Sequence, residues 1–270
     1  MLTTCTLTGL DESTDRGRWL RLATEHAFSE WGLLYSSARQ GASDASGDIR
    51  YPSQAFIEHT LQSAPSQVRL AVHFCGQAVH DLLHASYHAP AYGLLLKLQD
   101  RSRHLGRTGC AVAQLNLNMQ SSTPVNVQSL IELMRRHPTV FFITQDNKNN
   151  AELREVLRGV PNHGLLFDAS GGRGLAMTHV PEALSHVDCG YAGGLGPDNI
   201  QDKMPRIAQA ARDRSFWVDM EQSLRVQGRF NLDACRTVLD QCLPWVEPTA
   251  SSDVDPARGE DLRGRDATMG

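Results

Sequence analysis

Eight short apolar segments, separated by stretches with helical periodicity, constrain the fold of this chain more than any other feature. Several of the intervening stretches open with Ser, Asn or Asp, which are the preferred residues at a helix N-cap. Strands that alternate with helices in this way are typical of a parallel sheet. The apolar segments are residues 3–9, 30–36, 68–75, 110–117, 139–144, 163–168, 189–193 and 215–220.

Near-continuous apolar strands in this number favour closure into a barrel, with an open doubly wound sheet as the second choice. The 270 residues of the chain approach the roughly 250 that are typical of such a barrel. We therefore predict an α/β protein with a single (β/α)8 TIM barrel over residues 1–246. From residue 247 the chain is polar and charged, so we predict a disordered tail over residues 247–270.

Composition and charge argue against several classes of function. The net charge is −4 and the basic residues form no block, so we do not expect nucleic acid as a partner. No apolar run approaches the roughly 18 residues of a membrane span, and the first residues do not resemble a signal peptide, so we expect a cytoplasmic protein that does not bind membranes. The six cysteines form no CxxC pair, which argues against a zinc module or a disulfide framework.

An apolar strand runs directly into a glycine-rich loop in LLFDASGGRG, residues 165–174. Asp168 ends the strand, where a barrel carries its active site and a carboxyl group can act as general acid or base. Gly171, Gly172 and Gly174 follow, and glycines let backbone N–H groups approach an anionic substrate closely. The alternative interpretation is a tight turn with a solvated aspartate.

A second glycine pair, Gly193 and Gly194, closes the next strand in GYAGGLGPDNI, residues 190–200. A helix start follows at once, and in many barrels the loops after strands seven and eight bind a phosphate. A capped turn with no ligand is the alternative. The GxGxxG fingerprint of dinucleotide-binding folds is absent from this segment.

The order of LLFDASGGRG, YAGGLGPDNI and WVDMEQSLR resembles the C-terminal half of phosphoribosylanthranilate isomerase. Near the front, TLTGLDESTD, YSSARQ and AQLN resemble shorter motifs of that family, so the resemblance extends over most of residues 3–242. It implies an Amadori rearrangement of an N-phosphoribosyl arylamine, as in tryptophan biosynthesis, with no cofactor and no metal. In that family a carboxylic acid assists ring opening and a cysteine thiolate removes the C2 proton.

The resemblance assigns roles to individual residues. Asp168 stands at the position of the family's catalytic acid, and Thr8 stands at the position of its catalytic cysteine. Arg39 would bind the carboxylate of the substrate, and Asp219 would hold substrate hydroxyls or order a loop. Asn116 replaces a histidine of the family's pattern.

Departures from the pattern point to altered chemistry. A threonine hydroxyl is not a useful base at position 8, and Cys5 faces the other side of its strand. His73 and Cys75 are alternative bases, although a packed thiol and a hydrogen-bonded structural histidine are the favoured interpretations. Glu221 lies where the family binds phosphate, and its carboxylate would repel a phosphate by on the order of a few kcal/mol at 4 Å.

Other patterns in the chain could indicate metal or ligand binding. His80, His84 and His88 are four residues apart, as on one helical face, but helices lie outside a barrel and remote from its site. Asn147 and Asn150 follow the fifth strand and suit either a ligand or a helix cap. The loop QGASDASGDIR, residues 40–50, suits a lid or a solvated loop.

Together these observations predict an isomerase-like enzyme that acts on a small anionic substrate of phosphosugar type by general acid–base catalysis. Asp168 and Thr8 mark the catalytic positions. Two alternatives stay open: a non-catalytic ligand-binding barrel, and another isomerase or lyase whose base is His73, Cys75 or Glu221. The oligomeric state is not predicted. The substrate-binding residues are Arg39, Asn116, Gly171, Gly172, Gly174, Gly193, Gly194, Asp219 and Glu221.

Overall fold

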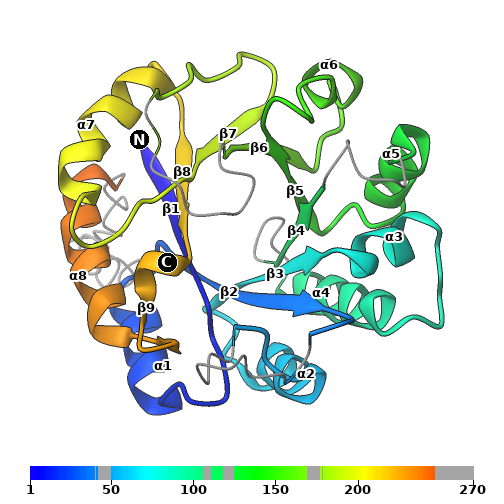
Figure 1. The fold of residues 1–270 in the computed structure, drawn as a ribbon, viewed down its shortest axis with the longest axis horizontal. Coiled ribbons are helices and arrows are strands. Elements are labelled where there is room, and N and C mark those ends of the chain that lie inside the picture. The colour runs from blue at the N-terminus through cyan, green and yellow to red at the C-terminus, as the bar shows by residue number, and fades with distance from the viewer. Residues whose placement is uncertain are drawn as a thin grey trace, which may run out of the picture.

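Eight parallel strands form a closed barrel in their sequence order (Figure 1). The computed structural model describes residues 1–39, 41, 50–105, 111–117, 125–168, 177 and 179–246. Gly171, Gly172, Gly174, nearly all of the loop 40–50 and the predicted tail 247–270 lie outside these residues. The strands are β1 (Leu2–Thr8), β2 (Ser29–Ser36), β3 (Arg69–Cys75), β4 (Ala111–Asn116), β5 (Phe141–Asp146), β6 (His163–Phe167), β7 (Asp188–Tyr191) and β8 (Phe216–Met220).

The pairing of the first strand with the last decides between the two predicted folds. β1 runs parallel to β8, with Leu2 opposite Phe216 and Leu7 opposite Met220. This contact closes the sheet, so the barrel prediction is confirmed and the open sheet is excluded.

The fifth strand differs most from its predicted bounds of 139–144. It begins at Phe141 and continues through Gln145 and Asp146, two polar residues that end the apolar pattern early: Gln145 faces the barrel interior, and Asp146 pairs with Arg154 on the opposite side of the strand.

Helices surround the barrel on the outside (Figure 1). Asp15, Ser53, Asn126 and Asn231 cap four of them through side-chain oxygens, as the sequence pattern of N-caps predicts. No helix within the described residues is long and apolar enough to cross a membrane. The helices are α1 (Arg16–Glu25), α2 (Gln54–Ser63), α3 (Gln77–Leu83), α4 (Pro90–Leu105), α5 (Val127–Arg136), α6 (Leu153–Val156), α7 (Ile200–Ala211) and α8 (Leu232–Cys242), with short 3-10 turns η1 (Gln222–Leu224) and η2 (Leu243–Trp245).

A small hairpin that the sequence analysis did not predict follows η1. Its strands are β9 (Arg225–Val226) and β10 (Arg229–Phe230), joined by Gln227 and Gly228, which both have positive φ as tight hairpin turns require. Arg225 donates hydrogen bonds from this hairpin to the Gly9 carbonyl and the Asp11 carboxylate. The hairpin therefore fastens the loop after β1 to the segment after β8.

The histidine spacing does not mark one helical face. Helix α3 ends at Leu83, and Ala85 takes a left-handed conformation with φ of 51°, so His88 lies beyond the helix. His84 Nδ1 lies 2.8 Å from the His80 carbonyl oxygen, within the same turn. The described residues contain no group of three potential metal ligands. The expectation of a shared helical face was therefore wrong.

The barrel interior has an apolar lower part. Ala71, Val112, Ile143 and Trp217 pack there together with Leu166 and Ala192. The indole of Trp217 lies directly on Gly190. The contact is so close that a Cβ atom at position 190 would lie only 2.1 Å from Trp217 Cε2. Small residues on neighbouring strands thus make room for one large side chain, and this layer forms the floor of the space above it.

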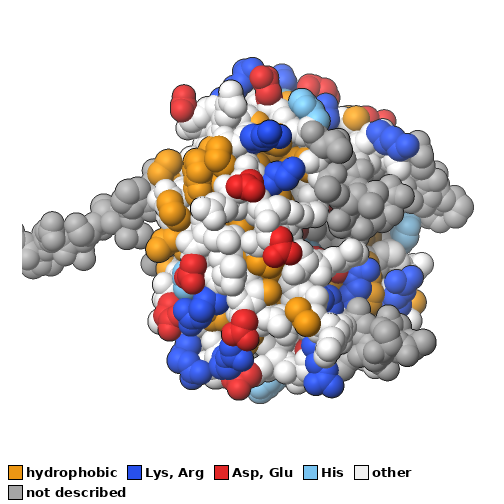
Figure 2. All heavy atoms as spheres, turned by 60° about the vertical axis from the view of Figure 1, so that its left-hand side comes forward, with side chains coloured by type: hydrophobic (Ala, Val, Ile, Leu, Met, Phe, Trp, Pro, Cys, Tyr) orange, Lys and Arg blue, Asp and Glu red, His pale blue; other side chains and the backbone are white. Residues whose placement is uncertain are grey.

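Charges on the outside of the barrel are mixed. On the side that carries α7 and α8, acidic and basic side chains are interspersed (Figure 2). Paired examples include Arg18 with Asp233 and Arg236 with Glu25. Among the described residues this face therefore presents no continuous patch of one sign.

Candidate active site

A cavity of about 530 Å³ opens at the C-terminal ends of the strands. This is the end at which barrel enzymes carry their catalytic groups. Its lining is mostly polar, with carboxyl, amide, imidazole, thiol and guanidinium groups. The polar side chains are Arg50, Tyr51, His73, Cys75, Gln114, Asn116, Gln145, Asp168, Asp219, Glu221, Gln222 and Ser223.

Strand alternation explains why these side chains share one cavity. Residues two apart on a strand face the same side, so five of these polar groups lie one step above an apolar residue of the barrel floor. On β8, for example, Asp219 lies above Trp217. The corresponding pairs on β3, β4, β5 and β6 are Ala71 and His73, Val112 and Gln114, Ile143 and Gln145, and Leu166 and Asp168.

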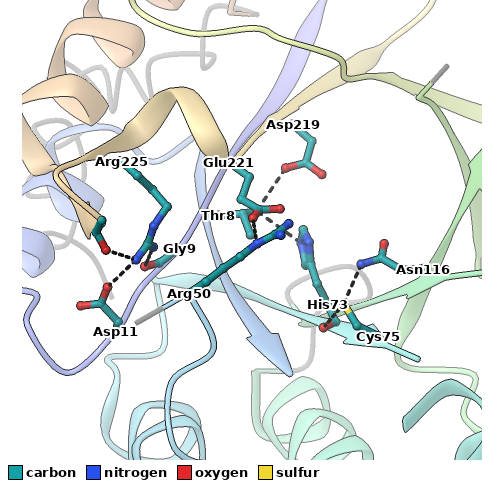
Figure 3. Close-up of polar contacts among 11 residues, drawn as sticks. Thr8, Gly9, Asp11, Arg50, His73, Cys75, Asn116, Asp219, Glu221 and Arg225 are labelled. Carbon is teal, nitrogen blue, oxygen red and sulfur yellow. Dashed lines mark hydrogen bonds and ion pairs between the residues drawn. The ribbon is translucent and has the colours of Figure 1, made fainter. Parts of the chain in front are cut away.

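The Thr8 hydroxyl lies between Asp219 and His73 in a buried hydrogen-bonded group (Figure 3). The Thr8 hydroxyl donates to Asp219 Oδ1 at 3.1 Å, and His73 Nε2 lies 3.5 Å from the same hydroxyl oxygen. Burial raises the pKa of Asp219 to about 8, and the nearby carboxylates of Glu221 and Glu30 act in the same direction. Asp219 is therefore mostly protonated at neutral pH.

His73 and Cys75 are poorly suited to act as bases. Burial lowers the pKa of His73 to about 3, so its imidazole is neutral and serves as a hydrogen-bonding group. Burial raises the pKa of Cys75 to about 11, although a hydrogen bond from Asn116 Nδ2 to its sulfur at 2.9 Å opposes that shift. The thiolate that would attack or remove a proton is therefore scarce near pH 7.

Asp168 follows β6 and also lines the cavity, with 4% of its surface exposed. Gln145 Nε2 donates a hydrogen bond to Asp168 Oδ2 at 3.0 Å. The amide of Gln145 thereby orients one carboxylate oxygen of Asp168. Asp168 and Asp219 are thus two carboxyl groups of one cavity with different surroundings.

Arg50 and Glu221 form an ion pair at the rim of the cavity (Figure 3). Arg50 Nε lies 2.5 Å from Glu221 Oε1, and the guanidinium also lies 5.5 Å from the centre of the Tyr51 ring. The chain thus neutralises the unexpected carboxylate at position 221 with an arginine from a distant loop.

The structure brings together most of the residues that the sequence analysis selected. Asn116, Asp168, Gly193, Gly194, Asp219 and Glu221 line the cavity, and Thr8 contacts it through Asp219. Arg39 does not line it: the side chain is exposed and its guanidinium packs against Tyr51 at 5.8 Å. The carboxylate-binding role of Arg39 thus stays a prediction, whereas Arg50 lines the cavity.

The polar lining residues that were not predicted from the sequence include Gln114, Gln145 and Ser223, besides Arg50 and Tyr51. Gln114 and Gln145 each lie on a strand at a position that alternation assigns to the interior, which was the available signal. Ser223 lies in η1, beyond the strand, and had no comparable signal. Asn150, by contrast, is buried and donates to the carbonyl oxygens of Leu117 and Gln145, which favours a structural role over ligand binding.

Comparison with known proteins identifies the architecture. No family model matches the chain, and no curated protein matches it in sequence. Among solved structures, phosphoribosyl anthranilate isomerase from Thermus thermophilus is similar with a TM-score of 0.53 and 15% identity, covering 90% of this chain and 99% of that one. TrpF from Jonesia denitrificans is similar with a TM-score of 0.51 and 13% identity, covering 89% and 97% of the two chains.

This chain has the fold of phosphoribosylanthranilate isomerase. At these identities the similarity concerns the fold alone, because one barrel scaffold hosts many reactions. The fold resemblance inferred from the glycine motifs is confirmed. The chemistry has to be argued from the side chains of the cavity.

Proposed function

We propose that this phosphoribosylanthranilate isomerase-like barrel is an enzyme that rearranges a small sugar-derived substrate by general acid–base catalysis. The observation that carries the proposal is the pair of unlike carboxyl groups, Asp219 and Asp168, in one cavity. A carboxyl group that burial keeps protonated can act as an acid, and a second carboxyl group in the same cavity can then act as the base.

Asp219 is the proton donor in this proposal. It is protonated at neutral pH because burial disfavours its charged form, and the hydrogen bond with Thr8 fixes its orientation. Asp168 is the proton acceptor, and Gln145 holds its carboxylate. The roles differ from those of the family, in which the residue at the Asp168 position is the acid and a cysteine is the base.

The reaction then balances within the substrate. Asp219 donates its proton to the ring oxygen of an N-glycosylamine, the bond between C1 and that oxygen breaks, and the nitrogen lone pair forms an iminium. Asp168 removes the C2 proton, the electron pair of that bond forms the C1–C2 double bond of an enamine, and the π pair of the iminium returns to nitrogen. Protonation at C1 and loss of the hydroxyl proton at C2 give the aminoketose, with no external oxidant or reductant. Each proton transfer of this kind contributes about 10²- to 10⁴-fold to a rate.

Amide groups supply the remaining contacts. Gln114 and Asn116 on β4 face the cavity, where they would bind the hydroxyl groups of a sugar chain. Their uncharged donors and acceptors suit a polyhydroxylated substrate. An anionic substrate of phosphosugar type, as the sequence suggests, would in addition need a cationic subsite.

A non-catalytic binding barrel is the second candidate, because Thr8 replaces the cysteine that the family reaction requires. The two candidates differ in turnover. Purified protein should be incubated with phosphoribosylanthranilate and with N-ribosylanthranilate while the aminoketose is followed by mass spectrometry. The enzyme proposal predicts conversion of at least one compound, reduced by about 10²- to 10⁴-fold in Asp219→Asn and in Asp168→Asn. Binding without conversion by the wild type and by Thr8→Cys would support the binding barrel instead.

A further inference from the structure

The end of the cavity formed by the segments after β7 and β8 differs from a typical anion subsite. In many barrels these segments hold a phosphate between them. Here the first residue after β8 is Glu221, whose side chain lines the cavity and is only 19% exposed. A phosphate at this end would meet a carboxylate in a partly desolvated place, where like charges repel strongly.

Arg50 does not make this end cationic. It is the single Lys or Arg that lines the cavity within the described part of the chain, and its guanidinium is already bound to Glu221 at 2.5 Å. The pair is neutral as a whole. It presents a carboxylate acceptor and a guanidinium donor side by side, which suits two hydroxyl groups better than one anion.

Donors in the two segments are also engaged within the protein. The Gly196 N–H donates to Asn199 Oδ1 at 3.1 Å, and Asn199 Nδ2 donates to the Gly194 carbonyl at 2.8 Å. The Ser223 hydroxyl donates to the Leu195 carbonyl. These hydrogen bonds satisfy groups that would otherwise be available to phosphate oxygens.

The two segments are packed against each other at the same place. A Cβ atom at Gly196 would meet the Cβ of Ser223 at 2.4 Å. No side chain of any size fits between them, and a phosphate is larger than a methyl group. The contact thus fills space between the loops after β7 and β8.

We infer that the Arg50–Glu221 end of the cavity binds an uncharged, hydroxyl-bearing group, so that the substrate is an unphosphorylated sugar derivative. The inference rests on the proposed function for the sugar-derived nature of the ligand. It departs from the phosphosugar expected from the sequence resemblance. The neutral ion pair and the engaged donors after β7 form a subsite for a diol.

Calorimetry with two stable probes tests this inference. The probes are 1-anilino-1-deoxyribitol and its 5-phosphate, which differ only in the charged group. Wild-type protein should bind the neutral probe at least tenfold more tightly than the phosphate. Glu221→Ser should improve binding of the phosphate at least tenfold, whereas Glu132→Ser, which removes an exposed carboxylate on α5, should leave both affinities unchanged.

The outcomes separate this inference from the proposed function. Tighter binding of the phosphate by the wild type would overturn the inference, and so would a failure of both probes to bind. Binding of the neutral probe with no isomerisation of any N-glycosylamine would keep the subsite and refute the enzyme. If Glu221→Ser does not fold, the ratio of the wild-type affinities for the neutral probe and its 5-phosphate still tests the inference.

Discussion

The Thr8 hydroxyl donates a hydrogen bond to the carboxyl group of Asp219 across the seam between the first and last strands, at 3.1 Å. Both groups are buried, and both lie above the apolar floor of the barrel. The contact links strands that are more than 200 residues apart in the chain. It also gives Thr8 a function that a cysteine base would not have, because Thr8 holds the proposed acid in place.

Replacement of Asp168 by asparagine should remove the proposed base and keep the shape of the site. We expect kcat to fall by about 10²- to 10⁴-fold, the usual contribution of one positioned acid or base. The free energy of unfolding should change little, because Gln145 can still pair with the amide oxygen. Denaturant titration beside the assay checks this, and wild-type turnover by the variant would remove Asp168 from the mechanism.

The activity should depend on the protonation of Asp219. Because burial raises its pKa to about 8, the proposed acid holds its proton below that value and loses it above. We expect kcat/KM to decrease as the pH rises through about 8, with residual activity in Asp219→Asn lacking this decrease. A profile that instead increases through pH 8 would make Asp219 the base.

The free energy of unfolding should also depend on the protonation of Asp219. The folded-state pKa of Asp219 is raised above its ordinary value near 4, so its contribution to stability is complete below about pH 4 and is lost as the pH rises toward 8. Asp219→Asn carries no such titration. Thermal unfolding between pH 4 and pH 9 should therefore show a steeper loss for the wild type than for the variant, and parallel curves would argue against the raised pKa.

Gly32 on β2 leaves space for Thr8. A Cβ atom at Gly32 would meet Thr8 Oγ at 2.4 Å and the Thr8 backbone Cα at 3.0 Å. Gly32→Ala should lower the free energy of unfolding by about 1–3 kcal/mol, as overpacking in a core does. Gly93→Ala is the matched control, because Gly93 lies in α4 with no heavy atom within 4 Å of the added Cβ, and it should stabilise by about 0.5–1 kcal/mol. Equal effects of the two changes would contradict the packing described for Thr8.

The fold could be predicted from the sequence because each strand carries its own apolar signal. All eight predicted strands exist, and each begins and ends within two residues of its predicted bounds. The site could be predicted where it depends on strand ends, as for Asn116, Asp168 and Asp219. At such positions alternation alone decides which way a side chain faces.

The remaining features depend on loops, whose course the local sequence does not determine. Arg50 enters the cavity and Arg39 stays outside it, although both flank the same segment and both pack on Tyr51. The histidine spacing favoured a helix through His88, but the chain leaves the helix before Ala85, which takes a left-handed conformation. Alanine rarely adopts that conformation, so the sequence did not indicate the end of the helix. Tertiary contacts decide these positions.

Deuterium incorporation tests the central claim most directly. N-ribosylanthranilate should be converted in D₂O by the wild type, Asp168→Asn and Asp219→Asn, and C1 of the aminoketose examined by NMR. Removal of the C2 proton by Asp168 and protonation at C1 from solvent predict one deuterium at C1 with the wild type and at least a hundredfold slower incorporation with each variant. If the wild type incorporates no deuterium, or if Asp168→Asn incorporates it at the wild-type rate, the acid–base assignment is wrong.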